Sequence, residues 1–314
     1  MVHFRAYLKQ LVPSVILFFL FAAVSTVQAK AISINPSHAY AEAVQIEKEV
    51  NVLLRHFKIA KKINPKPFKA KLLPRHVYEK AYAVLTKIQI LRQNNGFSRF
   101  TIVSLEPKIS VDSELVYEQT QRILTELRII KTRLGIPAQI TPAKTFSGKR
   151  PIDVFNKLHQ ISLNLELLND EEISPNHVFA VVMKIDEDIN TILQHLHIDD
   201  ATFPPAKVEN VRPADSLLTT FSLMYEIHRL QRQVGISRTD FSAFSKKDSN
   251  AQVYPSDVFN MVGMSFAELQ TIKANLGIKS IASPAERYEG KKAADVQQLL
   301  RWVTRKLRLI EQIL

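Results

Sequence analysis

Apolar side chains recur along the chain at alternating spacings of four and three residues. This apolar ladder begins eight times, counted from positions 36, 74, 113, 151, 175, 213, 255 and 293. Of its 48 positions, 42 hold Ala, Val, Ile, Leu or Phe, and the polar exceptions are Asn95, Thr120, Glu172, Ser216, Thr220 and Ser265. Two apolar positions in every seven are typical of helices that pack side by side at small crossing angles. The pattern therefore predicts an all-α, coiled-coil-like protein with eight helices.

Each ladder has a recurring start and a recurring end. Most copies start with Pro and carry His or Asp two residues later, as in Pro36 with His38 and Pro151 with Asp153. Pro is tolerated at the first helical position, and a polar side chain in the first turn satisfies free backbone N–H groups. A Leu-Gly-Ile motif or a variant of it follows 21 residues after each start, and its Gly is suited to a left-handed helix cap. We therefore expect each helix to run from its start to this motif.

The steps between the starts divide the helices into two sets of four. The steps measure 38, 39 and 38 residues, then 24, then 38, 42 and 38. Residues 36–59 also share Pro, His, Ala, Ile, Asn, Leu, His and Ile with residues 175–198 at an offset of 139. These observations predict a tandem duplication of a four-helix unit, with the units at residues 30–173 and 174–314.

The connections between the helices leave the packing direction open. Most contain about 15 residues, which is longer than an up-and-down bundle requires. A segment of this length can also lie back along a helix and join parallel neighbours. We expect antiparallel packing, with the connections gathered at the ends of the helices. Only the step from Glu172 to Pro175 is short enough to impose a tight turn or a kink.

The N-terminus has the three parts of a secretory signal peptide. Arg5 and Lys9 precede an apolar run from Leu11 to Val24, and small residues follow up to Ala29. The run is shorter than the roughly 20 residues of a membrane helix, so we expect cleavage after Ala29 rather than an anchor. We expect no transmembrane segment after removal of residues 1–29. Because exported eukaryotic proteins usually contain disulfides and this chain has no Cys, we expect a bacterial periplasmic or extracellular protein.

The composition offers little for catalysis or cofactor binding. The lack of Cys excludes Cys-ligated zinc, iron–sulfur clusters and a thiol nucleophile, and no G-x-S-x-G, H-E-x-x-H or G-K-[ST] motif is present. His38, His76 and His177 occupy the repeat position that holds Asp in other copies, which raises the possibility of a metal site at one end of a bundle. They lie tens of residues apart, however, and helix capping accounts for them. We therefore expect no enzyme activity, no metal and no cofactor.

Charge is the feature that points to a partner. The chain has a formal net charge of +12. Residues 30–173 carry 23 basic and 14 acidic side chains, and residues 174–314 carry 17 and 16. The excess is concentrated in the first long connection, which holds seven cations and no carboxylate: Lys58, Lys61, Lys62, Lys66, Lys69, Lys71 and Arg75. Such a segment is either a solvated loop or a contact for an anion.

Two classes of function are compatible with these features. The first is a non-catalytic exported binding or scaffold protein of the bacterial cell envelope. Its basic loop would contact an anionic envelope polymer, lipid head groups or another envelope protein, and not cytoplasmic nucleic acid. The alternative is a periplasmic sensing or carrier bundle that holds a small ligand in a polar pocket of the second unit. The candidate residues for that pocket are Ser216, Thr220 and Ser265, although a hydroxyl that bonds to its own helix is a common alternative.

Overall fold

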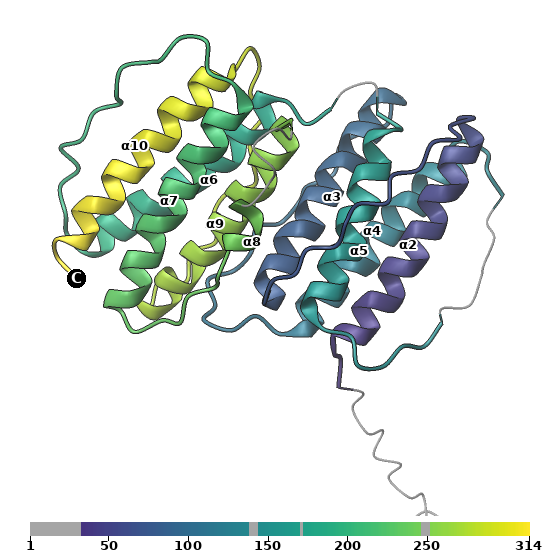
Figure 1. Ribbon diagram of the computed structural model, residues 1–314, viewed down its shortest axis with the longest axis horizontal. Helices are drawn as coiled ribbons and strands as arrows, with labels where there is room; N and C mark the ends of the chain where they lie inside the picture. The colour runs from purple at the N-terminus through teal and green to yellow at the C-terminus, as the bar shows by residue number, and fades with distance from the viewer. Residues whose placement is uncertain (1–32, 138–143, 170–171, 246–251) are drawn as a thin grey trace, which may run out of the picture. The chain divides into compact units, whose positions relative to one another are not determined.

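The described part of the chain is all-helical. The computed structural model describes residues 33–137, 144–169, 172–245 and 252–314, and the predicted signal peptide lies outside them. These residues contain no strand, and eight long helices begin at the eight predicted starts: α2 (Pro36–His56), α3 (Pro74–Asn94), α4 (Ser113–Arg133), α5 (Pro151–Glu166), α6 (Pro175–His195), α7 (Pro213–Gln233), α9 (Pro255–Asn275) and α10 (Ala293–Glu311) (Figure 1). A single short turn, α8 (Ser242–Ser245), lies between α7 and α9. Among the described residues, every helix is too short or too polar to cross a membrane.

The predicted helix starts are capped by side chains from the first turn. In seven of the long helices, the third helical residue accepts a hydrogen bond from the backbone N–H of the residue just before the helix. The acceptors are His38, His76, Asp153, His177, Asp215, Asp257 and Asp295. The prediction that these residues cap helices is confirmed. The described residues also contain no group of three His, Asp or Glu side chains that is suited to a metal ion.

The predicted ends are also present. Gly135 and Gly277 follow α4 and α9 with φ of +69° and +75°, the left-handed conformation in which Gly has no steric penalty. One helix departs from the pattern, because α5 ends at Glu166 and not at position 172. The fourth and fifth helices are therefore joined by residues 167–174 and not by the tight step that the sequence suggested.

The eight helices form two bundles of four. In the first bundle, α2 and α3 each contact both α4 and α5, and in the second bundle α6 and α7 each contact both α9 and α10. Each bundle thus places its first and second helices on one diagonal and its third and fourth on the other. The repeated arrangement agrees with a tandem duplication, which remains a prediction from the sequence.

The helices of the first bundle all run in the same direction. A small cavity is lined by residues from the first turns of α2, α3, α4 and α5, so the four N-termini meet at one end: Pro36, Ala39, Pro74, Val77, Ser113, Val116, Pro151 and Val154. The second bundle is parallel as well. The Ser216 hydroxyl donates to the Ala293 carbonyl near the starts of α7 and α10, and the Gln233 amide donates to the Glu311 carbonyl near their ends. The expectation of antiparallel packing is therefore wrong.

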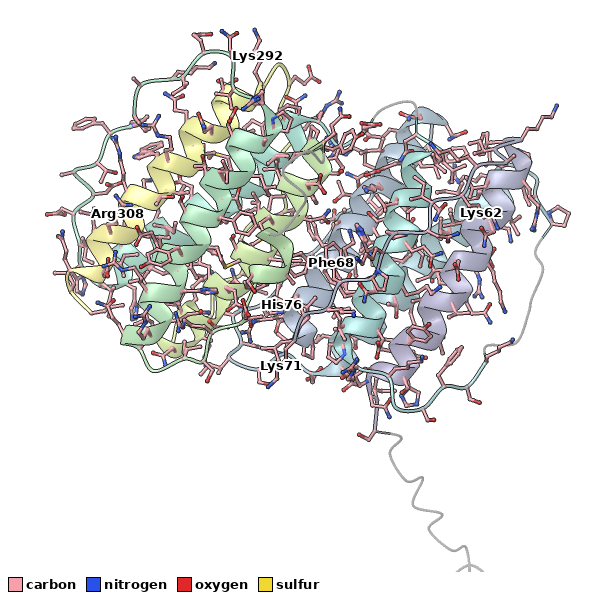
Figure 2. The ribbon with its side chains drawn as sticks, in the orientation of Figure 1. Lys62, Phe68, Lys71, His76, Lys292 and Arg308 are labelled. Carbon is pink, nitrogen blue, oxygen red and sulfur yellow. The ribbon has the colours of Figure 1, made fainter. Side chains whose placement is uncertain are left out.

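Parallel packing accounts for the long connections. A chain that leaves the end of one helix must travel back about 30 Å before it can start a parallel neighbour. The first connection, residues 57–73, makes this return along the surface of α5, where Figure 2 shows Lys62, Phe68 and Lys71 along its course. In the second bundle, residues 199–212 return along α10, where Thr202 accepts a hydrogen bond from Trp302 and Lys207 pairs with Asp295. The connections are thus packed elements of the fold.

The two bundles meet through helices that are not equivalent. The second helix of the first bundle, α3, packs against the third helix of the second bundle, α9. These two helices are antiparallel, because His76 near the start of α3 contacts Glu268, and Lys80 further along contacts Asn260 nearer the start of α9. Nearly all of α3 is buried as a result, including its charged side chains.

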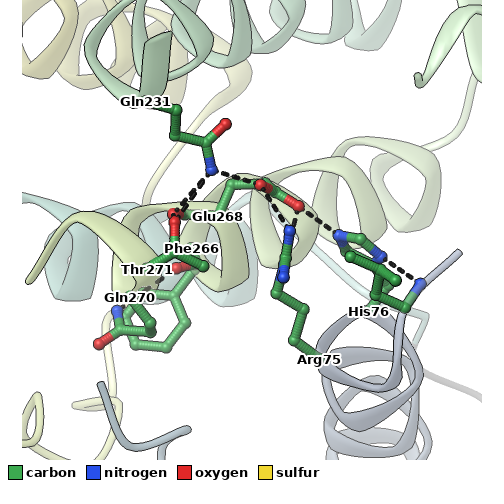
Figure 3. Close-up of polar contacts among 8 residues, drawn as sticks. Arg75, His76, Gln231, Phe266, Glu268, Gln270 and Thr271 are labelled. Carbon is green, nitrogen blue, oxygen red and sulfur yellow. Dashed lines mark hydrogen bonds and ion pairs between the residues drawn. The ribbon is translucent and has the colours of Figure 1, made fainter. Parts of the chain in front are cut away.

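The fully buried carboxylate of Glu268 is the centre of this contact (Figure 3). Arg75 donates to both of its oxygens at 3.0 and 3.2 Å, and His76 Nε2 lies 2.5 Å from Oε1. His76 Nδ1 accepts from the Leu73 N–H, so the proton of the neutral ring is on Nε2 and is donated to Glu268. Burial lowers the pKa of His76, which stays neutral. Burial also raises the pKa of Glu268, but the hydrogen bonds from His76 and Arg75 and the charge of Arg75 outweigh it and lower this pKa to about 2. The carboxylate is therefore ionised and is held mainly by the cation of the other bundle.

The matching carboxylate of the first bundle has its cation within its own bundle. Glu126 stands at the same position of α4 as Glu268 does of α9, and it pairs with Arg92 of α3 at 2.5 Å. The residue of α7 that matches Arg92 is Gln231, whose amide donates to Glu268 but carries no charge. The missing positive charge of the second bundle is thus supplied by Arg75 from the first.

We predict that a cation introduced at Gln231 compensates in part for the loss of Arg75. Arg75→Met leaves a buried carboxylate without a cation, and we expect it to lower the free energy of unfolding by about 3–5 kcal/mol. Adding Gln231→Arg supplies a cation from within the second bundle and should restore part of that loss in chemical denaturation. Arg287→Met, which removes an exposed pair with Glu289, is the control and should cost no more than about 1 kcal/mol. If the double variant is no more stable than Arg75→Met alone, charge does not explain the contact.

Candidate functional site

The basic connection is fixed to α5 by two asparagine side chains. Asn164 accepts from the Ile63 N–H and donates to the Ile63 carbonyl, both at 2.9 Å. Asn156 makes the same pair of bonds with Phe68, at 2.9 and 3.1 Å. Each side-chain amide thus bonds to both the N–H and the C=O of one residue of the extended segment, as a neighbouring β-strand would. The segment is held at two points, two helical turns apart on α5.

The apolar residues of this segment face the protein, and its lysines face solvent. Ile59, Ile63 and Phe68 are half-buried and Leu72 is buried. Six lysines are exposed: Lys58, Lys61, Lys62, Lys66, Lys69 and Lys71. We call these six residues the lysine row. None of them forms an ion pair with any residue that the structure describes.

Arg75, which the sequence grouped with these lysines, has a different environment. It belongs to the first turn of α3, and its side chain is 6% exposed and bound to Glu268. It therefore does not join the lysine row. Sequence proximity grouped a structural cation with six exposed ones, and only the packing of α3 on α9 separates them.

Aromatic rings anchor the middle of the basic segment. The Phe68 ring stacks on Phe244 of α8, with centroids 4.6 Å apart, and meets the edge of Phe155 of α5 at 5.9 Å. Phe244 follows Phe241, whose ring packs against His76 at 5.1 Å. The basic segment is thus packed against both bundles, and the exposed lysines project from a fixed base.

The matching connection of the second bundle does not carry a comparable excess of positive charge. In residues 199–212, Lys207 pairs with Asp295 at 2.6 Å, and Asp200 lies 3.4 Å from Lys306. The charges of that connection are thus largely compensated. The difference in net charge between the two halves of the sequence therefore appears in the structure as an uncompensated lysine row on one bundle.

The three residues of the predicted polar pocket make hydrogen bonds inside the second bundle. Ser216, Thr220 and Ser265 are buried, and the hydroxyls of Thr220 and Ser265 donate to the carbonyls of Ser216 and Met261 in their own helices. A cavity of about 650 Å³ lies elsewhere, between the second half of α3, the start of α6 and residues 284–289. Its walls include the rings of Tyr82 and Phe259 and the amide of Gln89.

Sequence reasoning did not identify Asn156, Asn164 or Phe244 as parts of this site. The two asparagines are eight residues apart on α5, a spacing that places them close to one face of a helix. That spacing was the available signal. Its meaning depends on the return path of residues 57–73, which the ladder pattern does not specify.

Comparisons with models of known protein families, with curated proteins and with solved structures gave no match.

We predict that the two asparagines control access to the lysine row. Asn156→Ala and Asn164→Ala each remove two hydrogen bonds to the basic segment, so the segment should open more often and trypsin should cleave after its lysines roughly tenfold faster. The rate is measured by mass spectrometry of short digests. Gln121→Ala, on the exposed face of α4, is the control. Equal cleavage rates in all of these proteins would mean that the amides do not fix the segment.

Proposed function

We propose that this protein is a non-catalytic exported binding protein of the bacterial cell envelope, whose lysine row holds an anionic polymer. The single observation that carries the proposal is the row itself: six exposed lysines that pair with no described residue, on a segment that is fixed to α5 by Asn156 and Asn164. An exposed lysine side chain stays hydrated, so its charge carries no desolvation penalty, and without a nearby carboxylate it has no favourable ion pair of its own. A row of such lysines is therefore suited to an external anion.

The extended form of the segment favours a linear partner. Between Lys58 and Lys71 the backbone spans up to about 40 Å at roughly 3.3 Å per residue. A polymer with a negative charge on each repeating unit can contact several of these lysines at once, and each contact releases counterions. A small anion would use only one or two of them.

The fixed backbone strengthens such binding without a pocket. The segment is already ordered by its asparagine and aromatic contacts, so binding does not have to order it again. The remaining cost is the ordering of lysine side chains, which keep much of their freedom at an anionic surface. We therefore expect moderate affinity that depends strongly on salt.

We predict that replacing Lys61, Lys62, Lys66, Lys69 and Lys71 together with Gln abolishes binding to inorganic polyphosphate at low salt. The melting temperature should remain almost unchanged, because these side chains are exposed and unpaired. Binding of the unaltered protein should weaken steeply with added salt, since the Debye length falls from about 10 Å at 0.1 M to about 3 Å at 1 M. Fluorescence anisotropy of labelled polyphosphate measures both effects.

The control for this experiment carries the same change of net charge at scattered positions. It replaces Lys108, Lys144, Lys207, Lys279 and Lys292 with Gln and should keep most of the binding. If the two variants lose binding equally, the net charge of the protein explains the binding and the lysine row does not. Vesicles of anionic phosphatidylglycerol form a second arm, and tighter binding to vesicles than to polyphosphate would favour lipid head groups as the partner.

The carrier alternative now rests on the cavity of about 650 Å³ beside α3 and α6. Aromatic walls together with amide and hydroxyl groups are typical of sites for small ligands. If this alternative holds, we expect a native mass spectrum of protein purified from its own host to contain a stoichiometric additional mass. A spectrum with the bare polypeptide mass favours the polymer-binding proposal.

A further inference from the structure

The outer face of α7 carries an apolar stripe that no described segment covers. Leu218 is 67% exposed and Tyr225 is 59% exposed, and the half-buried Phe221 lies between them. These residues are three and four positions apart and so lie along one side of the helix. Large apolar side chains at this exposure are unusual when they form a continuous stripe, and such stripes mark interaction surfaces.

The matching face of the first bundle indicates what kind of element covers such a stripe. The residues of α3 that correspond to Leu218, Phe221 and Tyr225 are Glu79, Tyr82 and Thr86. On this face, Glu79 packs against an antiparallel helix, α9, while Tyr82 and Thr86 line the cavity of about 650 Å³. The crossing is close because Gly263 of α9 meets Glu79, where an added Cβ would lie 3.4 Å from Glu79 Oε2. A helix with a small residue at the crossing point is therefore the kind of element that fits this position of a bundle.

Another copy of the α3–α9 contact does not fit the stripe. In that arrangement α4 of a second molecule, the counterpart of α9, would lie on α7. The positions of α4 that match the contact face of α9 include Glu118, Gln121 and Thr125, and all three are exposed polar residues. Packing this face on Leu218 and Tyr225 would bury unpaired polar groups against apolar ones.

The stripe is instead complementary to itself. Leu218 and Tyr225 lie on either side of Phe221 and Ser222, and Ser222 is small and exposed. When two copies of α7 cross antiparallel about this point, Leu218 of one faces Tyr225 of the other. The same arrangement places Asp215, which already pairs with Arg212 near the start of one helix, toward the exposed Arg232 near the end of the other, so that opposite charges approach each other.

A groove beside α7 has room for the side chains of a second molecule. It measures about 600 Å³ and lies between α7 and residues 237–242, with Phe221, Met224, Tyr225 and Phe241 among its walls. An apolar side chain from a crossing helix would fill this space and exclude water from the stripe.

We propose that α7 is a dimerisation surface, on which a second copy of this chain packs its own α7 antiparallel about a two-fold axis near Ser222. The contact is isologous, because the same patch serves both copies. One helix and its flanking groove make a small contact by the standard of stable interfaces, which bury roughly 800 Å² per partner. The dimer is therefore in reversible equilibrium with the monomer.

Sedimentation velocity over a wide range of protein concentration tests the proposal on the chain from Lys30 onward. We expect the sedimentation coefficient to rise with concentration toward that of a dimer. Leu218→Glu and Tyr225→Glu should each weaken the dimer about tenfold or more, since each change is present twice at the contact. Ile129→Glu, at an exposed apolar residue of α4, should leave the equilibrium unchanged. A monomer at all concentrations overturns the proposal.

Cross-linking tests the symmetry of the contact separately. The chain has no Cys, so a single introduced Cys reports on one position alone. Under oxidising conditions Ser222→Cys should form a disulfide-linked dimer, while Thr125→Cys on α4 should remain monomeric. A mixed disulfide between Ser222→Cys and Thr125→Cys chains, without a Ser222→Cys homodimer, would show contact of α7 with α4 and overturn the two-fold arrangement.

Discussion

The buried carboxylate of Glu268 is the constraint on which the relation of the two bundles depends. A carboxylate that is shielded from water requires a cation and hydrogen bonds. Removal of either lowers the free energy of unfolding by several kcal/mol. The second bundle offers only the neutral amide of Gln231 at the position where the first bundle has Arg92. Arg75 and His76 complete the site, so the second bundle obtains its charge balance from the first. This requirement pairs α3 with α9, which are not equivalent helices.

Within the part of the chain that the structure describes, a contact between non-equivalent helices leaves two faces without a partner. They are the outer face of α4 in the first bundle and that of α7 in the second. The face of α4 is polar and is suited to solvent, while that of α7 carries Leu218 and Tyr225. An open chain of molecules would require the polar face of α4 to pack on the apolar face of α7. The difference between the two faces is therefore the basis for inferring a closed dimer.

Parallel packing in each bundle has a second consequence, which concerns function. The first connection of each bundle returns along a helix and is held as a long surface segment by side chains of that helix. In the first bundle this segment is basic, and Asn156 and Asn164 hold it with its lysines outward. In the second bundle the charges of the corresponding segment are largely compensated. The fold therefore presents two similar connections, of which one is available to an anionic partner.

The sequence by itself determined the helices, because helix formation depends on local features that are readable along the chain. The Pro with His or Asp at most starts and the Gly at several ends act within one helix, and the apolar ladder marks the face that each helix buries. All eight starts are where the sequence placed them. An exception is the end of α5, where the apolar ladder continues past Glu166 but the helix does not. The exposed lysines were also predictable, since charge without nearby carboxylates is a property of composition.

Only the tertiary structure decided the direction of the helices, the role of Arg75 and the meaning of Asn156 and Asn164. An apolar ladder has the same spacing in parallel and antiparallel bundles, so it cannot select between them. Arg75 differs from its neighbouring lysines only because a carboxylate 193 positions away lies against it. The two asparagines acquire their role from backbone groups 88 and 101 positions away. Pairings over such separations depend on how the helices are placed together, which no local pattern records.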